Sequence, residues 1–270
     1  MSSETPSADV SSLPAEPPLP MDGERTFEEV FSSVSNVDGW MTTDQARLLW
    51  DSARALEPGA KIVEIGSYQG RSTIVLASAI RDGGTVTAID PHAGTDRGPQ
   101  EIKGKESEAE RDSRVFQENL ARAGVAARVK YVRSWSQEAL AGFEGEVDLL
   151  YIDGAHRYAP ARQDIEQWGA RVRPAGTLLI HDSFSSIGVT GAILASLMFS
   201  AEWIYVGRAQ SMTCYRRQRL SLGERFSSSM MQLAQLPWFV RNVMFKALIS
   251  AKMRGIAIKL GHDPAQAWPF

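Results

Sequence analysis

The hydrophobic positions fall into short apolar runs that alternate with longer segments of helical periodicity. The apolar runs cover 61–65, 85–89, 129–132, 147–152 and 177–180, and the helical segments lie near 42–56, 72–81, 114–123 and 160–172. Strands that are apolar on both faces and separated by helices are typical of a parallel sheet covered on both sides. Two further apolar runs, 203–206 and 212–216, are close enough in sequence to form an antiparallel hairpin at the sheet edge. The pattern therefore predicts an α/β fold with a doubly wound, mostly parallel, seven-stranded sheet.

The composition changes at both ends of the chain. Residues 1–22 are rich in proline and serine and poor in large apolar side chains, so we expect a disordered tail. Residues 218–270 carry seven Lys or Arg against two Asp or Glu, whereas the rest carries 22 against 30. Two apolar-rich segments, 222–236 and 238–260, are separated by Pro237. We therefore expect a domain over 23–217 and a basic helical appendage over 218–270.

Two roles for this appendage remain open. It can pack as a pair of helices on the domain or on a second subunit of a homodimer. Alternatively, its basic and apolar residues can anchor it in the interface of a membrane.

Overall charge and cysteine content restrict the function and the compartment. The chain has 29 Lys and Arg against 32 Asp and Glu, which argues against a nucleic-acid binder with a basic surface. Cys214 is the single cysteine, so an intramolecular disulfide is excluded and a reducing cytoplasm is favoured. Residues 1–20 lack the pattern of a secretory signal, and no run of 18 apolar residues predicts a transmembrane segment. We expect a cytoplasmic protein, associated with the cytoplasmic side of a membrane if the appendage is an anchor.

The first predicted strand leads into a glycine turn, residues 64–70, and a helix begins near Ser72. Gly66 and Gly70 allow a tight turn and a close approach to a ligand, and the start of the helix offers unpaired N–H groups. The spacing is G-x-x-x-G, which differs from the G-x-G-x-x-G that seats a pyrophosphate. The second strand ends at Asp90, whose carboxylate can accept hydrogen bonds from both hydroxyls of a ribose. These features together favour a cationic or hydroxyl-bearing ligand over glycines that only make a strand-to-helix turn.

These residues resemble the first two motifs of the class I S-adenosylmethionine-dependent methyltransferases. The resemblance covers roughly residues 40–216, with Glu64-x-Gly66-x-x-x-Gly70 as the first motif and Asp90 as the acid of the second. It implies a Rossmann-like methyltransferase fold with S-adenosyl-L-methionine as cofactor. In such enzymes the glycine turn lines the methionine part, the acid holds the ribose, and residues after the third strand contact the adenine. The cofactor-binding residues implied are Glu64, Gly66, Ser67, Tyr68, Gly70, Ser72, Asp90, Ser134, Trp135 and Asp153.

The fourth and fifth predicted strands both end in carboxylates. The fourth is followed by Asp153-Gly154-Ala155-His156-Arg157-Tyr158 and the fifth by His181 and Asp182. Because neighbouring parallel strands lie about 4.8 Å apart, two such carboxylates can converge on one cation. Oxygen ligands suit Mg²⁺, whereas an imidazole ligand favours a softer ion such as Mn²⁺.

The D-G-x-H-x-Y segment resembles that of O-methyltransferases that act on sugars, in which metal-ligating residues follow the fifth strand. This resemblance implies a divalent cation held by Asp153, His181 and Asp182. It also implies that the acceptor is a hydroxyl of a sugar, a glycolipid or a similar small molecule.

His156 and Asp153 are the candidate catalytic residues. A neutral His156 can take the proton of the acceptor hydroxyl, or the cation can lower the pKa of that hydroxyl. A buried structural role for His156 is the third interpretation. Enzyme activity is favoured over a cofactor-binding module with an inactive site, because Asp153, His156 and Asp182 are all present. Methylation of nucleic-acid bases is disfavoured, because the fourth strand does not end in a sequence of the Asn-Pro-Pro-Tyr type.

Three further features lie near the predicted site. Trp40 and Met41 either cap the cofactor or pack their helix on the sheet. His92 is more typical of a loop residue than of a substrate contact. The connection 91–112 leaves the carboxyl end of a strand, where α/β sheets bind their ligands, and we expect it to be a functional loop.

Overall fold

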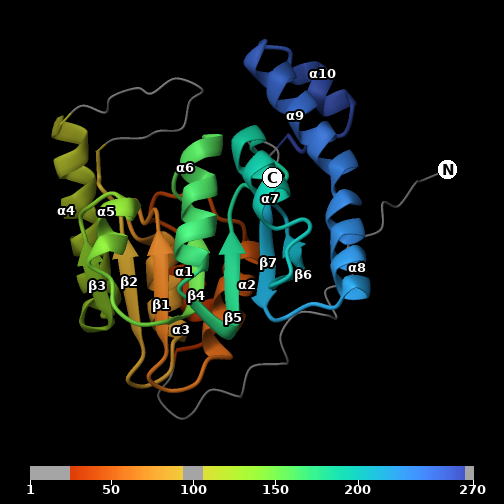
Figure 1. Ribbon diagram of the computed structural model, residues 1–270. Helices are drawn as coiled ribbons and strands as arrows, with labels where there is room; N and C mark the ends of the chain where they lie inside the picture. The colour runs from red at the N-terminus through yellow and green to blue at the C-terminus, as the bar shows by residue number, and fades with distance from the viewer. Residues whose placement is uncertain (1–24, 94–105, 265–270) are drawn as a thin grey trace.

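The seven strands form one sheet in the order β3-β2-β1-β4-β5-β7-β6 (Figure 1). The computed structural model describes residues 25–93 and 106–264. The first five strands are parallel, while β7 runs antiparallel to both β5 and β6. This confirms the predicted fold class and the hairpin at the sheet edge. The strands are β1 (Lys61–Ile65), β2 (Thr85–Ile89), β3 (Val129–Val132), β4 (Val147–Ile152), β5 (Val172–Ile180), β6 (Trp203–Ala209) and β7 (Met212–Arg217).

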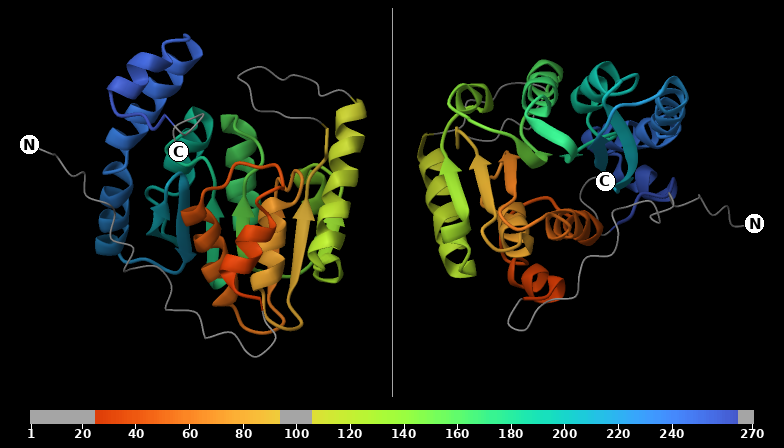
Figure 2. Two further views of the ribbon diagram at one scale, coloured as in Figure 1. Left: turned by 180° about the vertical axis from the view of Figure 1, so that it is seen from behind. Right: turned by 60° about the horizontal axis from the view of Figure 1, so that its bottom comes forward.

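Alternate residues of the central strands enter two separate cores, as the apolar runs predicted. Ile62 and Leu149 pack with the helices of one face, and Val63 and Leu150 pack with those of the other. The two layers are visible from behind and from below in Figure 2. The helices that contribute to the first core are α1 (Phe27–Ser33), α2 (Thr43–Arg54), α3 (Arg71–Ala79) and α4 (Glu106–Ala123). Those of the second are α5 (Ser136–Ala141), α6 (Tyr158–Gln163), the π-helical η3 (Asp164–Trp168) and α7 (Ile187–Ser196).

The segment 160–172 differs from its predicted helix. The helical part ends at Trp168, and β5 begins at Val172, five residues before the predicted start of the strand. Pro174 and Gly176 lie inside this extension, and both residue types are poor strand formers that hide it from the sequence pattern. The strand is also irregular here, since its register with β4 shifts between Val147 and Leu149.

The start of the domain contains one helix that the apolar pattern does not predict. Helix α1 begins after Thr26, which forms a capping box with Glu29. The helix has only seven residues, which is too short to show a clear hydrophobic periodicity. Helix α4, which contributes to the same core as α1, begins at Glu106, so residues 106–112 are helical although we expected a loop over 91–112. The rest of that loop (94–105) and the expected tail (1–22) lie outside the described residues.

The basic segment after β7 forms helices α8 (Leu222–Leu233), α9 (Leu236–Ser250) and α10 (Arg254–Lys259). Pro237 lies within the first turn of α9, where the missing N–H is not needed. Helix α8 packs along the sheet edge, where the Ser228 hydroxyl accepts a hydrogen bond from the Tyr205 amide at 3.0 Å. These contacts pack the C-terminal helices on the domain. None of the helices in the described ranges is long and apolar enough to cross a membrane.

Candidate active site

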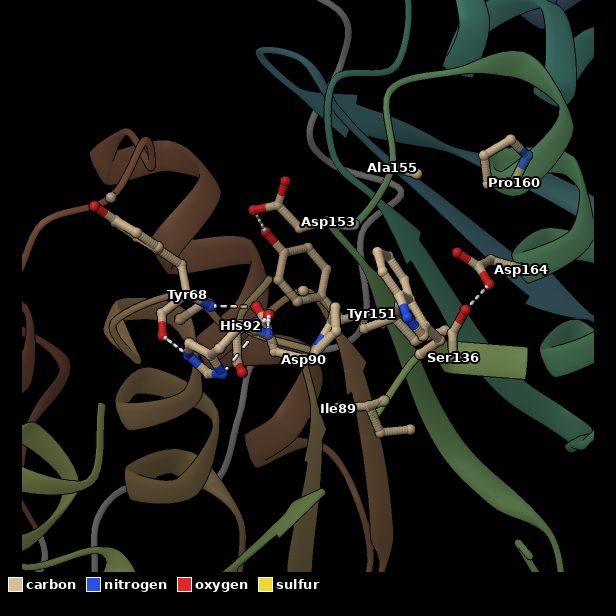
Figure 3. A pocket seen from close by; sticks show the side chains of 18 of the residues that line it. Tyr68, Ile89, Asp90, His92, Ser136, Tyr151, Asp153, Ala155, Pro160 and Asp164 are labelled. Atoms are coloured by element: carbon tan, nitrogen blue, oxygen red, sulfur yellow. Dashed lines mark hydrogen bonds and ion pairs between the residues drawn. The ribbon is translucent and has the colours of Figure 1, made fainter. Parts of the chain in front are cut away.

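A cavity of about 300 Å³ opens at the carboxyl ends of β1, β2 and β4 (Figure 3). Its volume lies at the lower end of the range of small-molecule sites. Among the predicted cofactor residues, those that line the cavity are Gly66, Ser67, Tyr68, Ser72, Asp90, Trp135 and Asp153. Three predicted residues do not line it: Glu64, Gly70 and Ser134. The structure therefore brings together residues from several strand ends, as expected for the ligand edge of an α/β sheet.

The Asp90 carboxylate accepts hydrogen bonds from the backbone of the glycine turn. Its Oδ2 accepts hydrogen bonds from the amides of Ser67 and Tyr68, at 2.9 and 2.8 Å, and its Oδ1 accepts one from the amide of His92 at 2.7 Å. A carboxylate offers about four acceptor positions, so three backbone donors leave room for a ligand hydroxyl. Asp90 thus has both a structural role in the turn and an acceptor directed to the cavity.

His92 stabilises the same turn from the next loop. Its side chain is buried, and its Nε2–H donates to the Tyr68 carbonyl at 2.7 Å, which leaves Nδ1 to accept from the Tyr131 hydroxyl at 2.8 Å. Tyr68 needs this support because its φ of 43° is left-handed, a region that costs non-glycine residues energy. His92 also lines the cavity, so it is more than the simple loop residue that the sequence favoured.

Gly66 lets the glycine turn approach the backbone of the neighbouring strand end closely. Its φ is 86°, and a Cβ there would lie 2.3 Å from the carbonyl oxygen of Asp153, which belongs to the loop after β4. Gly70 adopts a φ of 89° at the start of α3, where a Cβ would meet the Phe116 ring at 3.1 Å. Gly66 therefore serves the cavity directly, whereas Gly70 ends the turn and packs against α4.

Glu64 lies behind the turn, with no exposed surface, and accepts hydrogen bonds from the hydroxyls of Ser72 and Thr73. Burial raises the pKa of this carboxyl to about 8, because two hydroxyl donors only partly replace water around the charge. Glu64 therefore orders the junction of β1 and α3 from inside the protein.

We expect the stability of the domain to fall as the pH rises from about 4.5 to about 8 because of Glu64. Across this window the folded state keeps a proton that the unfolded chain releases, so each step in pH favours unfolding. Glu64→Gln removes the titration and should flatten the dependence by roughly 2–4 kcal/mol in the free energy of unfolding. Urea denaturation across this pH range measures it, with the exposed Glu57→Gln as the matched control. Equal slopes for wild type and Glu64→Gln would contradict the assignment.

The opposite end of the cavity contains a carboxyl that the sequence analysis missed. Asp164 Oδ1 accepts hydrogen bonds from the Ser136 hydroxyl at 2.5 Å (Figure 3) and from the side-chain Nε2 of Gln137 at 3.1 Å. Burial raises its pKa to about 6, against the opposing hydrogen bond from Ser136. The sequence contains one signal for it. Asp164 has helical spacing to Ala161 and Trp168 and so falls on the buried face of its helix, where a carboxyl requires hydrogen-bond partners.

Trp135 lines this end of the cavity and is 52% exposed, so its ring is free to cover a planar ligand group. Ser134, its neighbour, points elsewhere and donates to Glu138 at 3.0 Å. On the other side of the mouth, Trp40 and Met41 line the cavity, and the Trp40 ring lies 5.7 Å from the ring of Tyr68. This position supports capping of the ligand, one of the two roles that the sequence left open for them.

The ends of β4 and β5 form two imidazole–carboxylate pairs. His156 Nε2 lies 2.7 Å from Asp182 Oδ2, and His181 Nδ1 lies 3.1 Å from Asp153 Oδ1. The buried Tyr151 hydroxyl donates to Asp153 Oδ2 at 3.1 Å. Asp153 lines both the main cavity and a small adjoining pocket, whereas His156 and His181 line only the latter.

Asp182 is held in its ionised form. Burial raises its pKa, but the hydrogen bond from His156 and the nearby charges of His181 and Lys246 together lower it well below the usual range. Its φ of 54° is left-handed, and the loop that carries it is tied to α9. There, Lys246 Nζ donates to the Ser185 carbonyl at 2.9 Å, and Asn242 Nδ2 donates to the Phe184 carbonyl at 3.3 Å. The C-terminal helices thus support the loop of the predicted site.

The predicted metal ligands are close together but are engaged with each other. His181 lies 3.9 Å from Asp182 and 3.1 Å from Asp153. No group of three or more His, Cys, Asp or Glu side chains in the described part of the chain is arranged to hold a metal ion. The described residues therefore do not support the predicted site for a divalent cation, either Mg²⁺ or Mn²⁺.

Comparison with known proteins agrees with this geometry. A family model described as a methyltransferase domain matches residues 63–183. The uncharacterized protein y4gI of Sinorhizobium fredii is 31% identical over 139 residues, which is 48% of this chain and 14% of that protein. The chain therefore spans about one seventh of the length of this curated relative.

Solved structures share the fold at low sequence identity. A protein of Corynebacterium glutamicum has a TM-score of 0.55 and 13% identity, with 73% of this chain and 91% of that chain covered. The O-methyltransferase TomG of Streptomyces achromogenes, solved with S-adenosylmethionine, has a TM-score of 0.50 and 16% identity, with 72% and 89% covered. At these identities the likeness is one of overall fold.

Proposed function

We propose that the chain is an O-methyltransferase of the class I S-adenosylmethionine-dependent family and that it uses a histidine base; the match of residues 63–183 to a methyltransferase domain supports this. The acceptor proposed is a hydroxyl of a sugar, a glycolipid or a similar small molecule. The observation that carries the proposal is the His156–Asp182 pair, 2.7 Å apart, beside a cavity lined by the glycine turn. The D-G-x-H-x-Y segment supports the sugar-type acceptor.

The cavity fits the cofactor in two respects. The Ser67 hydroxyl is buried at its wall and has no hydrogen-bond partner among the described residues, so a polar ligand group would satisfy it. The absence of a side chain at Gly66 keeps the floor open between β1 and β4. When bound, S-adenosylmethionine supplies an electrophilic methyl group. Asp90 would accept from its ribose, and Trp135 and Asp164 lie at the end suited to its adenine.

The chain's own residues would then handle the acceptor proton. His156 donates its Nε2–H to Asp182, which leaves Nδ1 as the nitrogen that can take a proton from a hydroxyl. The ionised Asp182 stabilises the imidazolium that forms and fixes the orientation of the ring. Asp153, held by Tyr151 and His181, would orient the acceptor at the border of the two pockets.

A divalent cation does not fit this arrangement, because the carboxylates of Asp153 and Asp182 are each paired with an imidazole. We therefore assign the activation of the hydroxyl to His156. A rate that disappears with EDTA and returns with Mg²⁺ would replace this assignment by the cation.

Asp90→Ala should weaken the binding of S-adenosylhomocysteine by about 10- to 100-fold, measured by titration calorimetry. The variant loses the ribose acceptor, and hydrogen bonds to a charged group contribute about 1.5–3 kcal/mol. It also loses the acceptor that holds Ser67 and Tyr68. Ser134→Ala, a change just outside the cavity, is the matched control and should bind like the wild type. If Asp90→Ala stays folded and keeps the wild-type affinity, the cofactor site proposed here is wrong.

A further inference from the structure

The exposed apolar side chains of the protein are concentrated on its C-terminal helices. Fifteen large hydrophobic side chains are exposed among the described residues, and ten of them lie between Leu222 and Leu260. The densest part is residues 252–260, which we call the C-terminal tip. In the tip only Ala257 is buried. Its exposed residues include three cations and four large apolar side chains, and none is acidic: Lys252, Met253, Arg254, Ile256, Ile258, Lys259 and Leu260.

The tip packs against α9, and the inner side of α9 is fixed to the domain. Phe245 is buried, and Asn242 and Lys246 bond to the loop after β5. Figures 1 and 2 show α9 and α10 standing beyond the carboxyl ends of the parallel strands, the same end at which the cavity opens. An apolar surface left outside in this way marks an interaction site.

The positive charge of the C-terminal segment favours an anionic partner. Residues 218–270 have a net charge of +5 from seven cations and two acids, whereas the rest of the chain has 22 cations and 30 acids. Two tips facing each other in a symmetric dimer would bring like charges together. An anionic bilayer instead attracts the cations, accepts the apolar side chains between its lipids, and repels the acidic remainder. The charge distribution therefore orients the protein with the tip toward the membrane.

We propose that the C-terminal tip docks on the surface of an anionic phospholipid bilayer. Docking places the carboxyl edge of the sheet, and with it the cavity, on the membrane side of the protein. An acceptor carried by a lipid would suit this orientation; that further step rests on the function proposed above, whereas the docking itself does not.

Vesicle co-sedimentation of the full chain tests the docking. We expect binding to vesicles of phosphatidylcholine mixed with phosphatidylglycerol, and a fall of about tenfold or more at high salt, because lipid attraction of this kind is screened. Reversal of the tip charges (K252E, R254E and K259E together) should lower binding by a similar factor. So should replacement of its apolar residues (M253S, I256S and L260S together). The matched control K61E, K130E and R171E makes the same change in net charge at exposed positions outside the C-terminal helices.

Several results would overturn the proposal. These are no binding to the anionic vesicles, equal binding to phosphatidylcholine alone, and an equal loss of binding in the control variant. A dimer in sedimentation velocity that the apolar replacement dissociates would assign the tip to a second copy instead. The affinity for S-adenosylhomocysteine is expected to be unchanged in all variants, so failure of the docking and failure of the methyltransferase proposal are distinguishable.

Discussion

Replacement of His156 by alanine is expected to lower the turnover number by about two to four orders of magnitude, the range that general acid–base catalysis contributes. The affinity for S-adenosylhomocysteine should stay at the wild-type value, because His156 lines only the pocket that adjoins the main cavity. Asp182→Asn should cause a loss of similar order, since the amide cannot stabilise the imidazolium. Methyl transfer to a panel of sugar acceptors, followed with a labelled methyl group, measures both variants.

Two further measurements separate a base from a structural histidine. Imidazole in the buffer should restore part of the activity of His156→Ala, which a misfolded site would not allow. The double variant with Asp182→Asn should be little worse than either single one, because residues that act as a unit have non-additive effects. Full activity of folded His156→Ala would exclude His156 as the base.

The second large effect is expected for Gly66→Ala. The added Cβ would meet three backbone atoms of the loop after β4: the carbonyl oxygen of Asp153 at 2.3 Å, its carbon at 2.6 Å and Gly154 Cα at 2.8 Å. No side chain can rotate away, and alanine is also strained at the φ of 86°. Overpacking and backbone strain together should cost about 2–5 kcal/mol in the free energy of unfolding and lower the Tm by about 5–15 °C.

Gly142→Ala is the matched control for this effect. Gly142 ends α5, and a Cβ there would have no neighbour within 4 Å. Thermal unfolding followed by circular dichroism should therefore leave the control close to the wild type. If Gly66→Ala melts with the control and binds S-adenosylhomocysteine normally, the close approach of the turn to the loop after β4 is not as described.

Periodicity predicted the sheet well because each strand is buried on both faces. The alternation of Ile62 and Val63 between two cores is a direct result of that burial. The start of β5 was missed because Pro174 and Gly176 interrupt its pattern while β4 still pairs with it at Val172. Residue types along the chain predicted the start of β5 poorly, because its length depends on pairing with β4.

Site residues were predictable from the sequence where a carboxylate directly follows a predicted strand. Asp90 and Asp153 line the cavity for this reason. Glu64 illustrates the limit: motif spacing placed it with the cofactor residues, but the direction of a side chain at one strand position depends on the pleat, and here it points into the protein. Asp164 gave one local signal, a carboxyl on an apolar helix face, but its partner Ser136 lies 28 residues away, so the local pattern could not place the two in one site.

The support of the loop after β5 by α9 has a consequence for biosynthesis. Phe184 and Ser185 receive their side-chain hydrogen bonds from Asn242 and Lys246, which follow them by 58 and 61 residues. A ribosome makes this loop well before it makes α9. The nascent domain can therefore form its sheet and glycine turn while the loop that carries Asp182 still lacks the hydrogen bonds from Asn242 and Lys246. The methyl-transfer site would thus mature last, when the C-terminal helices emerge.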